Sequence, residues 1–179
     1  MGATQGAHAP SPRFAERTLV MVLADLAGFT RAVAGLQAVE IAELLDRFYV
    51  LCGDQVIAAG GRVVKFSGDN CLAVFEPTAA ADAVATAIAL RHAVTSMGSE
   101  RGLPMDLGAN IHMATVAIGR FGSESAPTDD VIGVGVIHTY RMGAGPGIRI
   151  SEPVYRKLPN DQRGSWNKHQ PPATYTLVS

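Results

Sequence analysis

The sequence predicts a single α+β domain, because strand patterns and helix patterns follow one another in the order β-α-β-β-α-β. The chain has 179 residues, of which 47% are hydrophobic and 17% are charged, so it can bury the core of one domain. Two stretches have apolar residues at helical spacing, and extended apolar stretches lie before, between and after them. This order is typical of a ferredoxin-like split βαβ core, here followed by extra C-terminal strands and helices.

The chain is expected to begin with a flexible lead-in over residues 1–16, which are mostly small or polar and include prolines. This segment lacks the apolar run of a signal peptide, so we expect the folded domain over residues 17–179. The first strand is predicted within residues 18–28, a continuous apolar run that is ended by Asp25 and Gly28. Such a run fits a strand that is covered on both faces.

A long helix is predicted over residues 37–61. Its apolar side chains fall on one stripe, and its charged residues fall largely elsewhere. Glu43 and Arg47 have the spacing of a supporting i,i+4 ion pair, and Gly60 and Gly61 are expected to end the helix.

Residues 62–76 predict a tight β-hairpin, because two apolar runs flank a Ser-Gly-Asp-Asn turn. Lys65 lies inside the first strand of this hairpin, and Asp69 lies at its tip. An otherwise apolar hairpin therefore carries a cation and an anion close to its turn, which makes both residues candidates for a functional task.

An alanine-rich second helix is predicted from Thr78, its expected N-cap, to Gly98, its expected end. Residues 105–121 are expected to form an extended arm, and residues 123–130 a polar loop.

The stretch 131–147 is ambiguous from its pattern alone. Its glycines and β-branched residues favour a strand, whereas Val136, Tyr140 and Arg141 could share one face of a short helix.

The last part of the chain predicts two strands and a short helix. Residues 147–151 and 173–178 have strand patterns. Between them, residues 151–158 predict a helix of one or two turns, with Ser151 as its cap and Pro153 in its first turn.

Composition excludes several classes of protein. The net charge is −1 and no cluster of Lys and Arg occurs, so a nucleic-acid partner is not expected. No stretch approaches the ~18 apolar residues of a membrane span. Cys52 and Cys71 lie in apolar segments without metal-ligand spacing, so we expect reduced thiols in the core of a cytoplasmic protein.

Three blocks of the sequence, VLADLAGFT (residues 22–30), GGRVVKFSGDNCLAVFE (60–76) and VIGVGVIHTYRM with GPGIRISEPVY (131–155), together resemble the class III nucleotide cyclase homology domain. The resemblance extends over roughly residues 18–178. It implies conversion of a nucleoside triphosphate to a 3′,5′-cyclic monophosphate and pyrophosphate, by dimers with active sites at the subunit interface. For this chain we expect ATP as substrate, cyclic AMP as product and a homodimer.

The resemblance also assigns Asp25 and Asp69 to two divalent metal ions, Mg²⁺ or Mn²⁺, which such oxygen ligands suit. A split βαβ sheet would bring the end of the first strand beside the hairpin tip. The alternative is that each acid merely caps a strand or a turn. Backbone N–H groups near Gly28, Phe29 and Thr30 could bind the triphosphate where the chain turns into a helix.

Lys65 and Asp130 occupy the positions that recognise the base in the family that the chain resembles. A lysine can donate to N1 of adenine, and an aspartate can accept from its exocyclic amine, whereas guanine would present an oxygen to the aspartate. The pair is therefore expected to select adenine. The alternatives are a strand lysine that extends to solvent and a loop acid beside Asp129.

The late block departs from the family pattern. Arg141 is in place to stabilise charge on the triphosphate, but the ribose-orienting asparagine is replaced by Ile137, which cannot hydrogen-bond. His138, one residue further on, is the candidate to contact the substrate in its place, although one residue turns a side chain by about 100° around a helix; the alternative is a surface or packing histidine. The Gly-Ile-His-x-Gly stretch of the family is also altered, at residues 110–114, and Lys168 is the candidate for a phosphate-binding lysine.

In the expected homodimer, each site takes Asp25 and Asp69 from one chain and Lys65, Asp130 and Arg141, with Lys168, from the other. Because of Ile137 and the altered stretch 110–114, three outcomes stay open: a slow cyclase, a cyclase that holds the ribose by another contact, and a catalytically silent module that binds nucleotide or a protein partner. A cyclase for another base is a separate alternative, which concerns the interpretation of Lys65 and Asp130.

Overall fold

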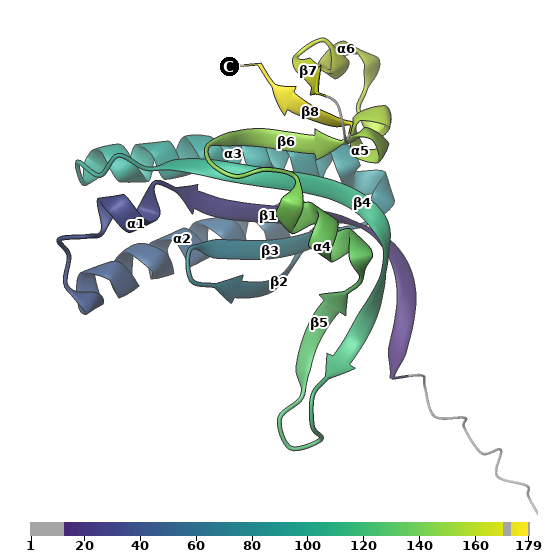
Figure 1. Cartoon of the computed structure of the whole chain (residues 1–179), viewed down its shortest axis with the longest axis horizontal. Helices are drawn as coiled ribbons and strands as arrows, with labels where there is room; N and C mark the ends of the chain where they lie inside the picture. The colour runs from purple at the N-terminus through teal and green to yellow at the C-terminus, as the bar shows by residue number, and fades with distance from the viewer. Residues whose placement is uncertain (1–12, 170–172, 179) are drawn as a thin grey trace, which may run out of the picture.

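The computed structural model describes residues 13–169 and 173–178, which form one sheet with helices on both of its faces (Figure 1). The strands in chain order are β1 (Phe14–Ala27), β2 (Arg62–Ser67), β3 (Asn70–Phe75), β4 (Asp106–Phe121), β5 (Thr128–Ile132), β6 (Gly147–Ser151), β7 (Trp166–His169) and β8 (Thr174–Leu177). The helical elements are α1 (Phe29–Ala32), α2 (Ala38–Ala58), the 3-10 turn η1 (Pro77–Ala79), α3 (Ala80–Glu100), α4 (Val134–Arg141), α5 (Glu152–Lys157) and α6 (Asn160–Arg163).

β1 lies inside the sheet, whose strand order is β2-β3-β1-β4-β6-β8-β7, with β5 paired to β4. β1 is antiparallel to β3 on one side and, along its whole length, to β4 on the other. β4 and β6 are parallel. The predicted α+β class and the order β-α-β-β-α-β are confirmed, and the elements from β5 onward follow this core as C-terminal additions, of which β6, α5 and β8 were predicted.

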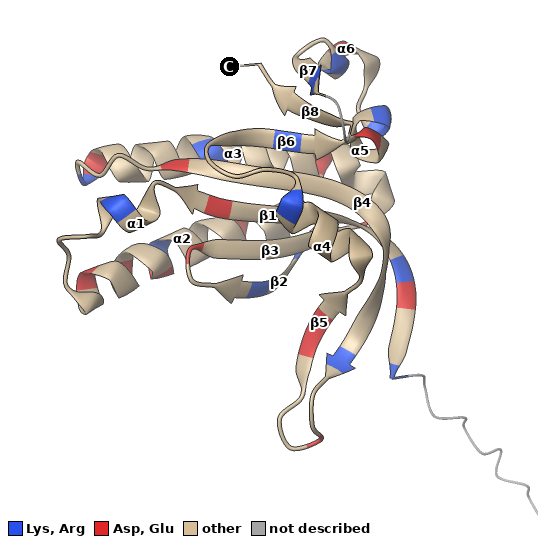
Figure 2. Cartoon of the chain, viewed as in Figure 1, with Lys and Arg blue, Asp and Glu red and all other residues tan. Residues whose placement is uncertain are grey.

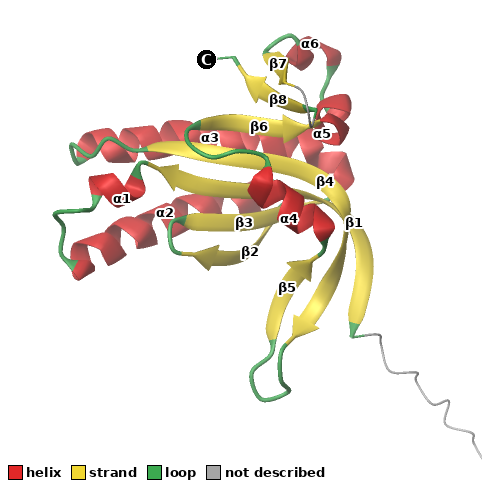
Figure 3. Ribbon diagram, in the orientation of Figure 1, coloured by secondary structure: helices red, strands yellow, loops and turns green. Residues whose placement is uncertain are grey.

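The main core lies between the sheet and the long helices α2 and α3. Figure 3 shows these two helices on one side of the sheet and the short helix α4 on the other. Residues of β1 alternate between the two sides, as in any strand: Val20 and Val22 belong to the main core, and Met21 belongs to a second cluster with Val136 of α4 packed against it. One face of the sheet is thus deeply covered, whereas the short helix α4 lies on the other face in the described part of the chain.

The ends of two elements differ from the prediction. β1 begins at Phe14, inside the expected lead-in, and residues 1–12 of that lead-in lie outside the described residues. The expected N-cap Thr78 lies in η1, α3 begins after Ala79, and the helix runs past Gly98 to Glu100. Gly98 does not end the helix. Its missing side chain leaves room for the returning chain, because a Cβ there would lie 2.7 Å from the Leu103 carbonyl oxygen.

Helix α4 decides the ambiguous stretch in favour of the helical alternative. The last three residues of the expected polar loop belong instead to strand β5, in which Asp129 and Asp130 lie opposite Arg120 and Gly119 of β4. Asp130 is therefore a strand residue and not a loop acid. β7 and α6 are additional.

The ion pair predicted between Glu43 and Arg47 is replaced by a longer-range one. Arg47 bonds Glu100 of α3 at 2.5 Å, so it joins the two long helices to each other. Cys52 and Cys71 are free and buried, as expected, and the thiol of Cys71 together with burial raises the pKa of Cys52.

Charged residues are spread over many elements (Figure 2). Within the described part of the chain, no helix has the length and apolar character needed to cross a membrane.

Candidate active site

Asp25 and Asp69 lie side by side because of the strand register. Asp25 is paired with Asn70 across β1 and β3, and the backbone N–H of Leu26 donates to the carbonyl oxygen of Asp69 at 3.1 Å. The two acids, residues 26–31 and Gly145 line a cavity of about 420 Å³, which we call the acid cavity. The structure therefore brings together the acids that the sequence assigned to metal ions, and Gly28, Phe29 and Thr30 with them.

The acid cavity concentrates negative charge. Burial raises the pKa of Asp25, the neighbouring charge of Asp69 raises it further, and the guanidinium of Arg149 lowers it. Ionising Asp25 beside Asp69 thus costs free energy. A divalent cation between the two carboxylates would offset this cost.

The donor set of the cavity fits Mg²⁺ or Mn²⁺. Both ions prefer oxygen ligands, and Mg²⁺ is usually held by one or two carboxylates while waters and substrate phosphates complete its shell. Among the described residues no group of three or more His, Cys, Asp or Glu side chains could hold a metal. The chain offers two carboxylates, which suits a site that is completed by a triphosphate.

The turn that follows Asp25 requires a glycine. Gly28 has φ +84° and precedes α1, and a Cβ there would lie 3.1 Å from the Pro104 carbonyl oxygen. This conformation turns residues 28–30 along the wall of the acid cavity, where part of a phosphate group could approach the backbone.

A residue that sequence reasoning missed supports the hairpin turn. The hydroxyl of Tyr49, on α2, donates to the carbonyl oxygen of Gly68 at 2.6 Å, and its ring stacks on Phe66 with centroids 4.2 Å apart. Gly68 has φ +59°, the left-handed conformation that a tight turn needs. Tyr49 thereby holds the turn that carries Asp69. Its position in the middle of a helix provided no signal for this role.

Lys65 and Asp130 also meet, although 65 residues separate them in sequence. The Lys65 ammonium bonds the Asp130 carboxylate at 2.7 Å, with the two side chains 38% and 19% exposed. Asp130 additionally accepts from the N–H of Val131 at 2.8 Å. A register shift between Val63 and Lys65 interrupts the pairing of β2 just before the lysine. The pair is partly accessible to solvent, and the Asp130 carboxylate is bonded by both the Lys65 ammonium and the Val131 N–H.

Helix α4 contains the residues at which the sequence departs from the cyclase pattern. Ile137 is 52% exposed, and Arg141 is the exposed last residue of the helix. His138 instead packs against His112 of β4, with ring centroids 4.5 Å apart. Burial and the neighbouring His138 lower the pKa of His112 to about 4. His138 therefore has a partner within the fold, and His112 is a second residue that sequence reasoning did not single out.

The remaining candidate, Lys168, lies in β7, at the other end of the strand order from Lys65 in β2. Its ammonium lies 5.7 Å from the ring centroid of Tyr175. Neither lysine lines the acid cavity, and neither Asp130 nor Arg141 does. Within one chain, the predicted metal ligands and residues 28–30 therefore line the acid cavity. The other residues predicted to bind the base and the phosphates lie outside it.

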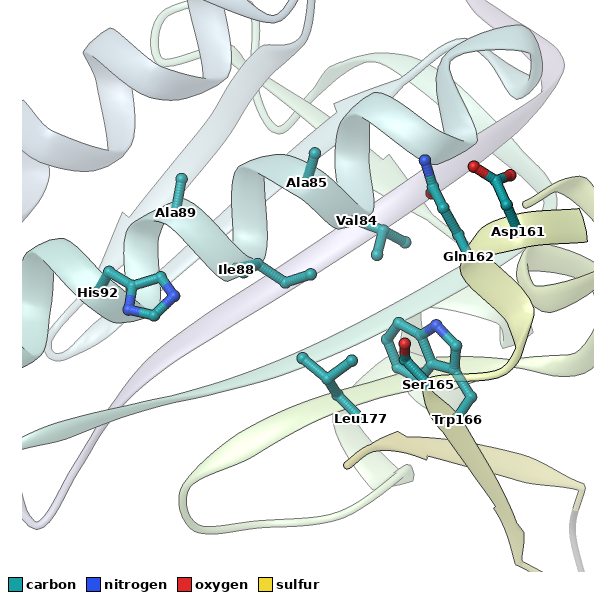
Figure 4. A pocket seen from close by; sticks show the side chains of 10 residues that line it. All are labelled: Val84, Ala85, Ile88, Ala89, His92, Asp161, Gln162, Ser165, Trp166 and Leu177. Carbon is teal, nitrogen blue, oxygen red and sulfur yellow. The ribbon is translucent and has the colours of Figure 1, made fainter. Parts of the chain in front are cut away.

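A larger hollow lies elsewhere, between α3 and the C-terminal segment (Figure 4). Its volume is about 510 Å³, and its walls are mostly apolar, with Ile88, Trp166 and Leu177 among them. Among the described residues that line this hollow, Asp161 is the only one with a carboxylate. None of the predicted site residues is among them. The acid cavity is therefore the better candidate for phosphate and metal chemistry.

The chain is similar to known nucleotide cyclases. It superposes on the guanylyl cyclase Cya2 with a TM-score of 0.80 and 25% identity, over 91% of this chain and 92% of Cya2. The adenylyl cyclase CyaB from P. aeruginosa shares the fold, with a TM-score of 0.81 and 19% identity over 93% and 96% of the two chains.

An adenylate cyclase of Anabaena cylindrica is 29% identical over 79% of this chain. This chain spans 31% of that relative's length. No protein-family model matches the chain. The chain thus has the fold of the class III nucleotide cyclase catalytic domains, and these similarities identify it as a cyclase homology domain.

Proposed function

We propose that this domain converts ATP to 3′,5′-cyclic AMP and pyrophosphate, as a homodimer that uses two Mg²⁺ or Mn²⁺ ions per site. The observation that carries the proposal is the acid cavity, in which Asp25 and Asp69 from separate segments meet beside a backbone turn.

In this reaction the ribose 3′-oxygen attacks the α-phosphorus, loses its proton, and displaces pyrophosphate in line. The bound ions would neutralise phosphate charge and lower the pKa of the attacking hydroxyl. Asp25 and Asp69 would hold those ions, and residues 28–30 would lie along the phosphates. Such catalysis depends on positioning and on charge stabilisation.

The Lys65–Asp130 pair supports adenine as the base. The lysine would donate to N1 and the aspartate would accept from the exocyclic amine, and guanine would set an oxygen against the carboxylate. Their contact at 2.7 Å in the single chain means that the two groups are already oriented toward one another. Proteins of this fold include both adenylyl and guanylyl cyclases, so the fold does not distinguish adenine from guanine. The proposal of adenine is therefore based on these two residues.

The homodimer would complete each site. Helix α4 and its surroundings leave apolar side chains exposed on the thinly covered face of the sheet, among them Ile132 at 48% and Val134 at 82%. A second copy would cover them, and it would bring Lys65, Asp130 and Arg141, with Lys168, toward the acid pair of its partner. Arg141 would then stabilise charge that develops on the triphosphate.

Ile137 replaces the asparagine that orients the ribose in the cyclase pattern, and we expect a low turnover rate for this reason. Loss of one preorganised donor commonly lowers the rate of catalysis by roughly 10²–10³-fold. The same residue supports the second candidate function, a silent module that binds nucleotide or a protein partner. The retained acid pair argues against that module, since two carboxylates without a cation are costly. ATP as substrate and two reduced thiols suit a cytoplasmic location.

The test is an assay of the purified protein with ATP, GTP, CTP and UTP, first with Mg²⁺ and then with Mn²⁺. We expect cyclic AMP that disappears in both Asp25→Ala and Asp69→Ala. Cyclic GMP or a pyrimidine product would overturn the reading of Lys65 and Asp130. If no cyclic product forms with any nucleotide and metal, the silent module replaces the enzyme.

A further inference from the structure

A glycine-rich segment between α4 and β6, residues 143–147, forms part of the wall of the acid cavity through Gly145. We call it the glycine loop. Gly145 and Gly147 have φ +76° and +107°, so the loop adopts a backbone conformation that side chains rarely allow. A loop with this much backbone freedom needs external contacts to hold one shape.

The guanidinium of Arg149 provides most of those contacts. It donates to four successive carbonyl oxygens of the loop: Ala144 at 2.6 Å, Gly145 at 3.2 Å, Pro146 at 3.2 Å and Gly147 at 3.4 Å. It also lies against Gly143, where a Cβ would be 2.6 Å from Nε. A planar group with five N–H donors can serve several acceptors at once, which a lysine ammonium cannot do in the same geometry.

Asn110 completes the set. Its Nδ2 donates to the Gly143 carbonyl oxygen at 2.9 Å, and the side chain is only 4% exposed. Asn110 lies opposite Arg149 in the pairing of β4 with β6. All five carbonyl oxygens of the glycine loop are thus bonded by two neighbouring side chains. Asn110 also stands where the family pattern has its first arm glycine, so this contact is a property of the present chain.

The glycine loop in turn lies against Asp25. Asp25, Gly108 and Gly147 face one another across the adjacent strands β1, β4 and β6. A Cβ at Gly108 would lie 2.5 Å from both Asp25 Oδ1 and the Gly145 carbonyl oxygen. The carboxylate and the loop carbonyl therefore share the space above one glycine, and moving the loop would change the space available to Asp25.

We propose that Arg149, together with Asn110, is a positioning residue of the cation site: it holds the glycine loop so that Asp25 stays oriented toward Asp69. This inference depends on one part of the proposed function, namely that the acid cavity binds a divalent cation. Outer groups that orient a metal-binding side chain commonly change metal affinity by about 10–100-fold when removed.

The test compares Arg149→Met, which keeps an aliphatic stem without donors, with Arg149→Lys and with the control Arg156→Met. Arg156 is an exposed α5 residue whose side chain bonds Glu152 outside the acid cavity. Mn²⁺ binding is measured by the electron paramagnetic resonance of free Mn²⁺, without nucleotide and with 3′-deoxy-ATP, which cannot cyclise. Thermal unfolding without metal is recorded for each variant.

For Arg149→Met we expect Mn²⁺ binding to weaken roughly tenfold, with a partial return in Arg149→Lys and less than a twofold change in Arg156→Met. In the cyclase assay, the Mn²⁺ concentration for half-maximal rate should rise while the KM for ATP at saturating Mn²⁺ stays within about twofold.

Mn²⁺ binding by Arg149→Met equal to that of the unmodified protein would overturn the inference. So would a fall in kcat with an unchanged Mn²⁺ requirement. If Arg149→Met fails to fold, Arg149→Lys decides the matter by the same binding measurement. If the unmodified protein binds Mn²⁺ but forms no cyclic nucleotide, the proposed function fails, and the binding comparison still tests the role of Arg149.

Discussion

Replacing Asp25 by asparagine removes one of the two negative charges of the acid cavity while nearly preserving the shape of the side chain. In the metal-free protein the ionised carboxylate is opposed by burial and by Asp69, so its pKa is raised. A raised pKa in an acid means that stability is lost as the pH rises through it, because the folded state prefers the neutral form. Asp25→Asn imitates that neutral form, and it should stabilise the metal-free protein at neutral pH.

The magnitude follows from the charges. Two neighbouring unit charges about 4 Å apart interact by about 1 kcal/mol in bulk water and by about 4 kcal/mol at the effective dielectric constant of about 20 near a protein surface, so about 1 kcal/mol is the lower bound for close carboxylates. For a domain of this size, 1 kcal/mol corresponds to about 2–4 °C in Tm. Divalent ions should act in the opposite sense: Mn²⁺ at about ten times its Kd would stabilise the unmodified protein by about 1.4 kcal/mol, but not Asp25→Asn.

The assay is thermal unfolding by circular dichroism at neutral pH, with chelator and then with Mn²⁺, for the unmodified protein and Asp25→Asn. Asp46→Asn, which removes an exposed charge from α2, is the control and should behave like the unmodified protein. We expect the two melting temperatures to exchange order when Mn²⁺ is added. The reasoning is refuted if Asp25→Asn is less stable than the unmodified protein in chelator, or gains as much stability from Mn²⁺.

Three further changes test other parts of the site. Ile137→Asn should raise turnover, by up to roughly 10²-fold if the ribose is held as in the family pattern; a steady-state rate that is unchanged or lower would mean that another contact holds the ribose. Tyr49→Phe removes the 2.6 Å bond to Gly68, and we expect weaker Mn²⁺ binding with about 1 kcal/mol lower stability in urea unfolding; unchanged Mn²⁺ binding would show that the hairpin turn holds its own shape. His112 has a pKa of about 4 in the fold, so unfolded chains take up its proton first as the pH falls, and stability should drop between about pH 6.5 and 4. In His112→Gln that drop should shrink by about 3 kcal/mol, and urea unfolding curves that keep their full pH dependence would contradict the assignment.

The predictions that succeeded depend on signals that are local in sequence. The apolar run ending at Asp25 and the hairpin turn at Asp69 each define a strand end, and sheet topology then brings them together. The resemblance predicts that Lys65 and Asp130 recognise the base together, and the structure places the two side chains 2.7 Å apart; recognition of the base stays a prediction.

The errors have a common cause in contacts between distant segments. Thr78 has the right chemistry for a cap, but the chain takes a 3-10 turn at Pro77–Ala79 before α3. Asp130 looked like a loop residue among polar neighbours, yet pairing with β4 makes it part of a strand. Arg47 has an i,i+4 partner available and bonds Glu100 instead. In each case tertiary contacts outweighed a local preference worth a few tenths of a kcal/mol to about 1 kcal/mol.

By itself, the sequence determined the order of β1, α2, β2, β3, α3 and β4 and the places of the two acids beside strand ends, because apolar periodicity and turn chemistry act over a few residues. The replacement of a polar residue by Ile137 was visible through the resemblance to the cyclase pattern. Only the tertiary structure decided that Tyr49 holds the hairpin turn, that His138 meets His112, and that Arg149 and Asn110 bond every carbonyl of the glycine loop. These contacts join segments from different elements. Their geometry follows from strand register and from how closely the backbone packs at residues such as Gly108, and neither is encoded in any one stretch of the chain.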